Sequence, residues 1–340
     1  MAPWAFPNPS IPSVEVLTSG LAQPLLTVVV DTEEEFDWSK PFDRSQTSVE
    51  AMRQLHRFQT VCDRRDIKPT YVVDYPVATQ KAGMEALVPI FNEDRANIGA
   101  HLHPWVNPPH KESVTAEHSF PGNLPIELES EKLTVLIDAL EDTFGSRPMA
   151  YKAGRYGLGP NSFELITKLG IDIDLSPCPP WNFSDQAGPN YTACSANPYW
   201  VGKNRELLVI PTTGAYVGWL AGIGDTLHSI ADSSVLRKLR APGILARSGA
   251  VDRLLLSPEG FTLEENQRLV KALFSSGHRI FNLALHSPSL EVGRTPYVRS
   301  EKDLHGLLDS LGDFFDFFIS ELGGIVTDPL SIRKQLTELS

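Results

Sequence analysis

Apolar residues occur along the chain in two alternating arrangements. Short runs rich in Val, Ile, Leu and Ala are typical of buried strands, and longer stretches with apolar residues every three or four positions are typical of amphipathic helices. The short runs predict strands over residues 25–30, 69–74, 96–103, 148–153, 171–175, 207–210 and 279–286. The longer stretches predict helices over residues 48–66, 83–92, 127–144, 161–169, 262–275 and 300–322.

This alternation of strands and helices predicts an α/β fold with a parallel sheet and right-handed crossovers, either closed into a barrel or doubly wound. Residues 1–22 contain four prolines and are expected to form an N-terminal arm. No break in composition divides the chain further, so residues 23–330 are expected to form a single domain. The glycine-rich motifs of nucleotide-binding proteins and of serine hydrolases are absent from the sequence.

The first predicted strand ends in a concentration of carboxylates. Its apolar run is followed within seven residues by Asp31, Glu33, Glu34, Glu35 and Asp37. Carboxylates at the end of a buried strand repel one another and lose hydration, which a bound cation compensates. The stretch therefore indicates either a metal and general-base site at the edge of a parallel sheet or a solvated acidic loop.

Three further strand ends contain residues that a metal-dependent hydrolase uses. His101 and His103 are two positions apart, so their side chains point to the same side of a strand and can reach one ion. Arg155 follows the fourth strand, where its guanidinium either holds Asp31 ionised or belongs to a surface arginine in a turn. His286 ends the last strand and is either a core histidine or a general acid.

Composition and charge narrow the class of partner. The formal net charge is -12, from 30 basic and 42 acidic residues, which argues against nucleic acid and anionic membranes as main partners. The three cysteines form no C-x-x-C pair, so free thiols are expected. The sequence has neither a signal-peptide pattern at its start nor an apolar run long enough to span a membrane, and a cytoplasmic location is therefore expected.

The ordered motifs resemble a known family. Over about residues 24–322 the chain resembles the polysaccharide deacetylase superfamily, the NodB-homology carbohydrate esterases, and within it a bacterial WalW-like branch. The resemblance rests on V-D-T-E-E-E-F-D-W, I-G-A-H-L-H-P-W-V-N-P-P, K-A-G-R-Y-G-L-G-P-N-S and L-A-L-H-S-P-S-L-E-V-G-R-T-P-Y-V-R. It implies a distorted (β/α) barrel of about seven parallel strands and a bound divalent metal ion, with Zn²⁺ as the expected ion.

The resemblance also implies a role for each residue of the site. Asp31 matches the base, Glu33 the carboxylate ligand, and His101 and His103 the histidine pair that binds the metal. Arg155 matches the arginine that tethers the base, and His286 matches the general acid.

The spacing departs from the family pattern in two places. The usual adjacent aspartates are replaced by D-x-E, so either Glu33 or Glu34 can be the ligand. The histidines are two apart instead of four, which leaves open whether His101 binds metal.

The expected function is metal-dependent deacetylation of an N-acetylated sugar or carbohydrate derivative. The alternatives are hydrolysis of a non-sugar amide, as in allantoinase-like relatives, and a degenerate member that binds carbohydrate without cleaving it. Two residues near the fifth strand have two interpretations each: Asp174 either orients a catalytic histidine or is a packing residue, and Trp181 either forms a pocket wall or is a packing residue. Other aromatic residues that could stack on sugar rings or pack in the core are Trp105, Tyr191, Tyr199, Trp200, Tyr216 and Trp219.

Overall fold

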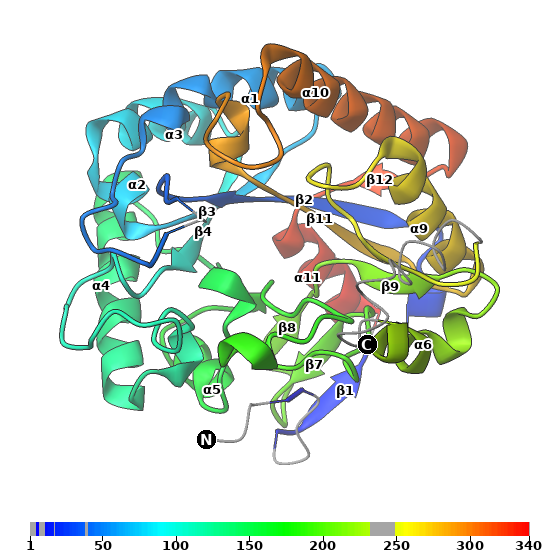
Figure 1. The fold of residues 1–340 in the computed structure, drawn as a ribbon, viewed down its shortest axis with the longest axis horizontal. Coiled ribbons are helices and arrows are strands. Elements are labelled where there is room, and N and C mark those ends of the chain that lie inside the picture. The colour runs from blue at the N-terminus through cyan, green and yellow to red at the C-terminus, as the bar shows by residue number, and fades with distance from the viewer. Residues whose placement is uncertain (1–4, 7–10, 17, 38–39, 232–248, 340) are drawn as a thin grey trace.

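The computed structural model describes residues 5–6, 11–16, 18–37, 40–231 and 249–339. A ring of strands lies inside a layer of helices (Figure 1). The strands are β1 (Ser13–Glu15), β2 (Leu25–Thr32), β3 (Thr70–Val73), β4 (Asn97–Leu102), β5 (Ala150–Ala153), β6 (Ile173–Asp174), β7 (Tyr199–Val201), β8 (Leu207–Val209), β9 (Gly214–Val217), β10 (Asp252–Leu255), β11 (Ile280–His286) and β12 (Ile325–Val326). The helices are α1 (Leu55–Asp63), α2 (Tyr75–Thr79), α3 (Lys81–Asn92), α4 (Ile126–Phe144), α5 (Ser162–Lys168), α6 (Gly224–Ala231), α9 (Leu263–Ser275), α10 (Glu301–Asp316) and α11 (Pro329–Glu338).

The main sheet is parallel over seven consecutive strands, in the order β8-β6-β5-β4-β3-β2-β11. β7 and β1 extend the β8 edge as antiparallel strands, and the short β12 pairs with the beginning of β2. β9 and β10 form a separate antiparallel pair between β8 and β11 in the chain. The α/β fold with about seven parallel strands that the sequence predicts is therefore confirmed.

The two edges of the parallel sheet meet through single hydrogen bonds rather than a continuous ladder. The Thr213 N–H, just after β8, donates to the Asn282 carbonyl of β11 at 3.1 Å. The Asn282 N–H donates in return to Thr213 Oγ1 at 2.8 Å. These bonds link the segment after β8 to β11.

Side chains on the strands alternate between an inner and an outer apolar cluster, as the period of two requires. On β2, Leu26, Val28 and Val30 face outwards and belong to the larger cluster that includes the helices. The inner cluster contains Leu25, Val29, Val72, Ala150, Ile173, Leu208 and Ile280 from six of the strands. Both faces of β2 are buried along its whole length, which explains its almost continuous apolar run.

Helix α11 closes the amino end of the barrel. Ile332 and Leu336 on this helix are buried in the inner cluster, and Figure 1 shows α11 near the middle of the ring. Although most of α11 lies beyond the expected domain end at residue 330, the helix contacts β6 and shares the inner cluster with Leu25 and Ile280, the first residues of β2 and β11.

The segment expected to be an N-terminal arm lies against the sheet where it is described. β1 pairs with β7, and Phe6 stacks on Tyr199 with ring centroids 4.8 Å apart. Residues 1–4, 7–10 and 17 of this segment lie outside the described residues, as does Trp38 of the first motif. The division into arm and domain stays a prediction.

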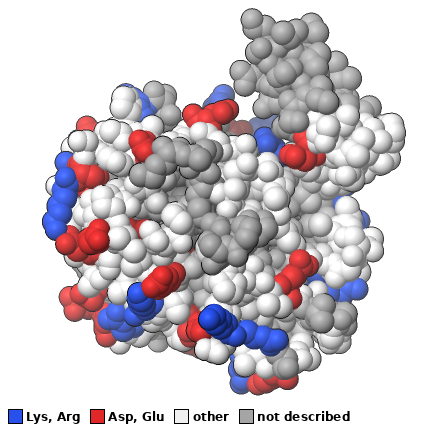
Figure 2. All heavy atoms as spheres, turned by 90° about the horizontal axis from the view of Figure 1, so that it is seen from below, with Lys and Arg blue, Asp and Glu red and all other residues white. Residues whose placement is uncertain are grey.

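The surface and the thiols agree with ordinary globular packing. Charged side chains of both signs are interspersed on the face shown in Figure 2. All three cysteines are buried and free, as expected. Among the described helices, none combines the length and the apolar character needed to cross a membrane.

The packing of α11 predicts a large difference between two isoleucine truncations. Ile332 is 0% exposed, whereas Ile319 is 37% exposed. Ile332→Ala should lower the free energy of unfolding by about 2–5 kcal/mol, because it leaves a cavity beneath the barrel. Ile319→Ala, the matched control, should lower it by about 1 kcal/mol or less. Denaturant unfolding measures both, and equal losses would contradict the role assigned to α11.

Candidate active site

The candidate catalytic side chains lie at the carboxyl ends of the parallel strands. Asp31 and Glu33 are an even number of residues from the core residue Val29, so they point to the same inner side of the barrel. His101 and His103 repeat this arrangement at the end of β4. All four side chains are buried. The sequence prediction that these residues gather at one sheet edge therefore matches the structure.

The register of the strands brings the remaining polar residues alongside. Asp31 on β2 lies beside His286 on β11, and His101 on β4 lies beside Lys152 on β5. Five strand ends thus contribute to one cluster, because β3 also places Asp74 next to the end of β2.

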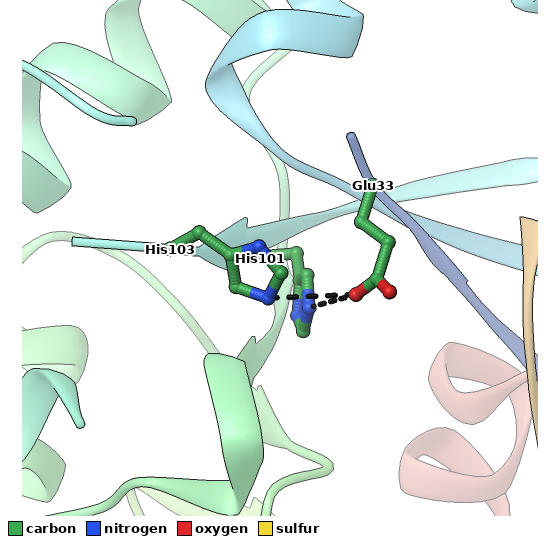
Figure 3. A group of neighbouring side chains, drawn as sticks. All are labelled: Glu33, His101 and His103. Atoms are coloured by element: carbon green, nitrogen blue, oxygen red, sulfur yellow. Dashed lines mark ion pairs between the residues drawn. The ribbon is translucent and has the colours of Figure 1, made fainter. Parts of the chain in front are cut away.

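Glu33, His101 and His103 form a compact donor set. The Nε2 atoms of the two imidazoles each lie 3.4 Å from Glu33 Oε2, and Figure 3 shows both rings turned towards this carboxylate. Burial alone raises the pKa of Glu33, but His286, His101 and His103 outweigh burial and hold that pKa below its usual value. The three potential ligand atoms lie within 4.8 Å of one another, as an ion-binding group requires.

The hydrogen bonds of the imidazoles leave the right atoms for a metal. His101 Nδ1 lies 2.9 Å from the Lys152 carbonyl, which fixes the ring proton on Nδ1. His101 Nε2 is buried and has no hydrogen-bond partner within the described parts of the chain. A buried nitrogen lone pair without a donor is costly, and coordination would satisfy it. The donor set therefore fits a divalent cation such as Zn²⁺, with positions left for water and substrate.

Glu34 occupies a different place from Glu33. Its Oε2 lies 2.8 Å from His103 Nδ1, and its N–H donates to Asp74 Oδ2 at 2.7 Å. Burial, with the charge of Glu33, raises the pKa of Glu34 to about 8. Glu34, Asp74 and His103 also form a compact group of potential ligands. However, a neutral imidazole that donates from Nδ1 to Glu34 keeps its lone pair on Nε2, so the geometry favours Glu33 as the ligand and Glu34 as the residue that orients His103.

Lys152, and not Arg155, holds Asp31. The Lys152 ammonium donates to both carboxylate oxygens of Asp31, at 2.6 and 2.7 Å, and both side chains are buried. Burial alone raises the pKa of Asp31, but Lys152 with His101 and His286 outweighs it and lowers the pKa below its usual value. The expected tether between Arg155 and Asp31 is therefore wrong, because Lys152 faces into the barrel from β5 whereas Arg155 lies beyond the end of that strand.

His286 faces Asp31 and is backed by a carboxylate that the sequence analysis missed. Its Nδ1 lies 2.6 Å from Glu259 Oε2, and its Nε2 lies 3.6 Å from Asp31 Oδ2. Burial disfavours the imidazolium, but Glu259, Glu33 and Asp31 outweigh burial and raise the pKa of His286 to about 10. The raised pKa favours the protonated imidazole, and Glu259 lies in hydrogen-bond contact with its Nδ1.

A cavity of about 540 Å³ opens over this cluster. Its charged and imidazole lining includes Asp31, Glu33, His101, His103, Arg155 and His286. Its aromatic wall consists of Phe36, Phe42, Tyr156 and Phe183. The six side chains named from the sequence as catalytic or ligating therefore share one cavity.

Several aromatic residues considered from the sequence are core residues instead. Tyr191, Tyr199 and Trp200 are buried, and Trp105 is buried with its ring stacked on His103 at 4.3 Å between centroids. The suggested contact of Asp174 with a catalytic histidine is also replaced. Among described residues its side chain accepts hydrogen bonds from the Ser176 hydroxyl at 2.6 Å and the Ser176 N–H at 3.3 Å.

Two solved structures resemble this chain over nearly its whole length. A Mycobacterium smegmatis protein assigned as a polysaccharide deacetylase matches with a TM-score of 0.56 and 15% identity, covering 97% of this chain and 96% of that one. Puue allantoinase matches with a TM-score of 0.55 and 16% identity, covering 91% and 89%. No protein-family model matches the sequence, and no curated protein does so.

At these identities the likenesses establish the fold. The resemblance read from the sequence motifs is thereby confirmed at that level, whereas the narrower WalW-like branch stays a prediction. The chain has the mostly parallel α/β-barrel fold of the polysaccharide deacetylases.

Proposed function

We propose that this protein is a metal-dependent hydrolase that removes the acetyl group from an N-acetylated sugar or carbohydrate derivative. One observation supports this more than any other. A single cavity holds a carboxylate and two imidazoles suited to a cation, with an ionised aspartate and a protonated histidine beside them. These are the parts needed to add water to an acyl carbon and to protonate the leaving amine.

Glu33, His101 and His103 would hold the cation, and we expect Zn²⁺. A divalent cation bound there would polarise the acyl carbonyl and make water more acidic. Glu34 keeps His103 in the required tautomer through its contact with Nδ1. The Lys152 carbonyl does the same for His101.

Asp31 is the general base of the proposed reaction. It remains a carboxylate because Lys152 contacts both of its oxygens. In that state it can take a proton from the attacking water, and Lys152 compensates for the change in local charge.

His286 is the proposed general acid, on the opposite side of Asp31 from the imidazole pair in the strand order. Its raised pKa keeps a proton available at neutral pH, and its contact with Glu259 orients the ring. Proton transfer to the leaving nitrogen then completes cleavage of the C–N bond, with acetate and the free amine as products.

Hydrolysis of a non-sugar amide is the second candidate. The structure of Puue allantoinase matches this chain with a TM-score of 0.55, and the Mycobacterium smegmatis structure matches it with a TM-score of 0.56. Both reactions use the same set of chemical roles, so assays should include cyclic and linear amides beside acetylated sugars. If the protein neither binds a metal nor hydrolyses any of these substrates, we would conclude that it binds carbohydrate without cleaving it.

Metal content is the first test of this proposal. Protein loaded with zinc and dialysed should retain about one ion per chain, and His103→Ala should lose it, because two imidazoles and one carboxylate are the minimum donor set here. His305→Ala, on the exposed side of α10, is the matched control and should retain the ion. Elemental analysis measures the metal content of all three proteins. If the wild type retains no metal after loading with zinc, cobalt or nickel, the metal-dependent mechanism is wrong.

Removal of the base or the acid should affect rate far more than folding. Asp31→Asn and His286→Gln should each lower kcat/KM on an accepted substrate by about 10²- to 10⁴-fold, since each removes one proton-transfer group. Thermal unfolding checks that both variants fold. Near-full activity in either variant would show that the role is assigned to the wrong residue.

The pH profile should respond to Glu259. A general acid is active below its pKa and is lost as pH rises through it, and Glu259 is the largest of the charges that raise the pKa of His286. Glu259→Gln should therefore move the alkaline limb of kcat to lower pH. The measurement is kcat against pH from 6 to about 11. An unmoved alkaline limb would mean that His286 is not the group that titrates there.

A further inference from the structure

Arg155 is left without its expected partner and lies in the wall of the active-site cavity. It occupies a 3-10 turn, Gly154–Tyr156, directly after β5. Both Arg155 and Tyr156 have left-handed backbone conformations, with φ of 55° and 58°. Non-glycine residues in this region are strained, and such strain persists where the surrounding structure fixes it. The turn directs both side chains to the cavity that Asp31 and Glu33 also line.

The hydrogen bonds of Arg155 go to neutral oxygens. Its Nη1 donates to Ser119 Oγ at 2.5 Å and to the Ala116 carbonyl at 3.5 Å, and its Nη2 donates to Gln186 Oε1. A guanidinium has five N–H donors, so these bonds do not use all of them. No carboxylate of the described chain lies within ion-pair distance of Arg155.

The other charged groups around the cavity are better matched. Asp31 is paired with Lys152, Glu33 faces two imidazoles, and His286 contacts Glu259. Lys40 is paired with Asp37 at 3.0 Å.

Arg155 differs from these groups because the direct contacts of its half-buried guanidinium, among the described residues, are to neutral oxygens and aromatic rings. Burial lowers the pKa of Arg155 to about 10. Asp185 lines the same cavity but is exposed and makes no ion pair with Arg155 in the described structure. A positive charge that is partly desolvated and lacks a counter-ion is the complement of an anionic ligand.

Aromatic contacts hold the guanidinium in place near the reacting centre. Arg155 Cζ lies 4.0 Å from the centroid of Phe120 and 5.0 Å from that of Phe42. Phe42 packs on Trp105, which stacks on the His103 ring. The preceding residue, Gly154, also lies against this imidazole, because a Cβ placed on it would be 2.4 Å from His103 Cδ2. The guanidinium is thus positioned on the wall adjoining the proposed metal ligands.

We propose that Arg155 binds a carboxylate or phosphate of the substrate, so that the protein acts on an anionic N-acyl compound rather than on a neutral polymer. This inference rests on the proposed hydrolase function for the identity of the cleaved bond, but the anion site itself does not. The planar fork of arginine suits either oxyanion, and the ring contacts reduce the freedom lost on binding. The negative group would lie beside the acyl group being hydrolysed.

Anion binding by the metal-free full-length protein separates this site from the metal centre. Inorganic phosphate and, separately, malonate are titrated calorimetrically after removal of divalent ions. The wild type should bind at least one of these probes. Arg155→Met should weaken that binding by about tenfold or more, and Arg155→Lys by less, because lysine keeps the charge but not the fork. The preferred probe distinguishes phosphate from carboxylate.

Two further variants control for charge and for the metal ligands. Arg147→Met removes an exposed arginine that pairs with Glu141, so it changes net charge equally and should bind the probe as the wild type does. His103→Ala should also retain binding. Should Arg155→Met not fold, Arg155→Gln replaces it, with thermal unfolding as the check. Wild-type-like binding by a folded Arg155 variant, or no binding of either probe by the wild type, would overturn the proposal.

A kinetic comparison then links the anion site to catalysis. Zinc-loaded wild type is assayed on N-acetylglucosamine 6-phosphate and on N-acetylglucosamine. Arg155→Met should lower kcat/KM for the phosphorylated sugar, chiefly through KM, by a factor at least about tenfold larger than for the neutral sugar. If the protein hydrolyses neither sugar but still binds phosphate through Arg155, the result contradicts the proposed deacetylase function and supports the anion site.

Discussion

The structure depends on the compensation of four carboxylates buried at the ends of two adjacent strands. Asp31, Glu33, Glu34 and Asp74 lie at the ends of β2 and β3, away from water. Three kinds of compensation occur: an ammonium for Asp31, imidazoles for Glu33, and a raised pKa for both Glu34 and Asp74. Such a cluster is tolerable only if every charge is paired or neutralised, which dictates what the neighbouring strands must supply.

Strand periodicity predicted the parallel α/β arrangement and the strand ends at which the candidate residues lie, whereas their roles came from the family resemblance. Continuous apolar runs indicated strands buried on both faces, and alternation with helices indicated parallel pairing. Residues two apart at a strand end necessarily share a face, so the pairing of Asp31 with Glu33 and of His101 with His103 could be read directly. The same periodicity contained the signal for Lys152, since it is a lysine inside the short apolar strand β5, on the face of Ala150.

What the sequence could not reveal depends on contacts between distant segments. Glu259 lies after β10, in a part of the chain without a strong periodic pattern, and only the fold brings it to His286. The choice between Glu33 and Glu34 required knowing which imidazole nitrogen each carboxylate faces. The direction of Arg155 depends on two successive left-handed residues, a backbone state that neither Arg nor Tyr indicates by its identity.

The exchange of roles between Lys152 and Arg155 has a physical rationale. To hold Asp31 ionised requires a compact charge inside a crowded barrel, and one ammonium at 2.6 and 2.7 Å from both oxygens is sufficient. The larger planar guanidinium is then not needed at the base. Placed on the cavity wall against Phe120 and Phe42, it retains unused N–H donors, and its hydrogen bonds within the described chain go to neutral oxygens. Because Lys152 holds Asp31, Arg155 is available for the substrate recognition that we propose, and the departure from the expected tether is the main support for that proposal.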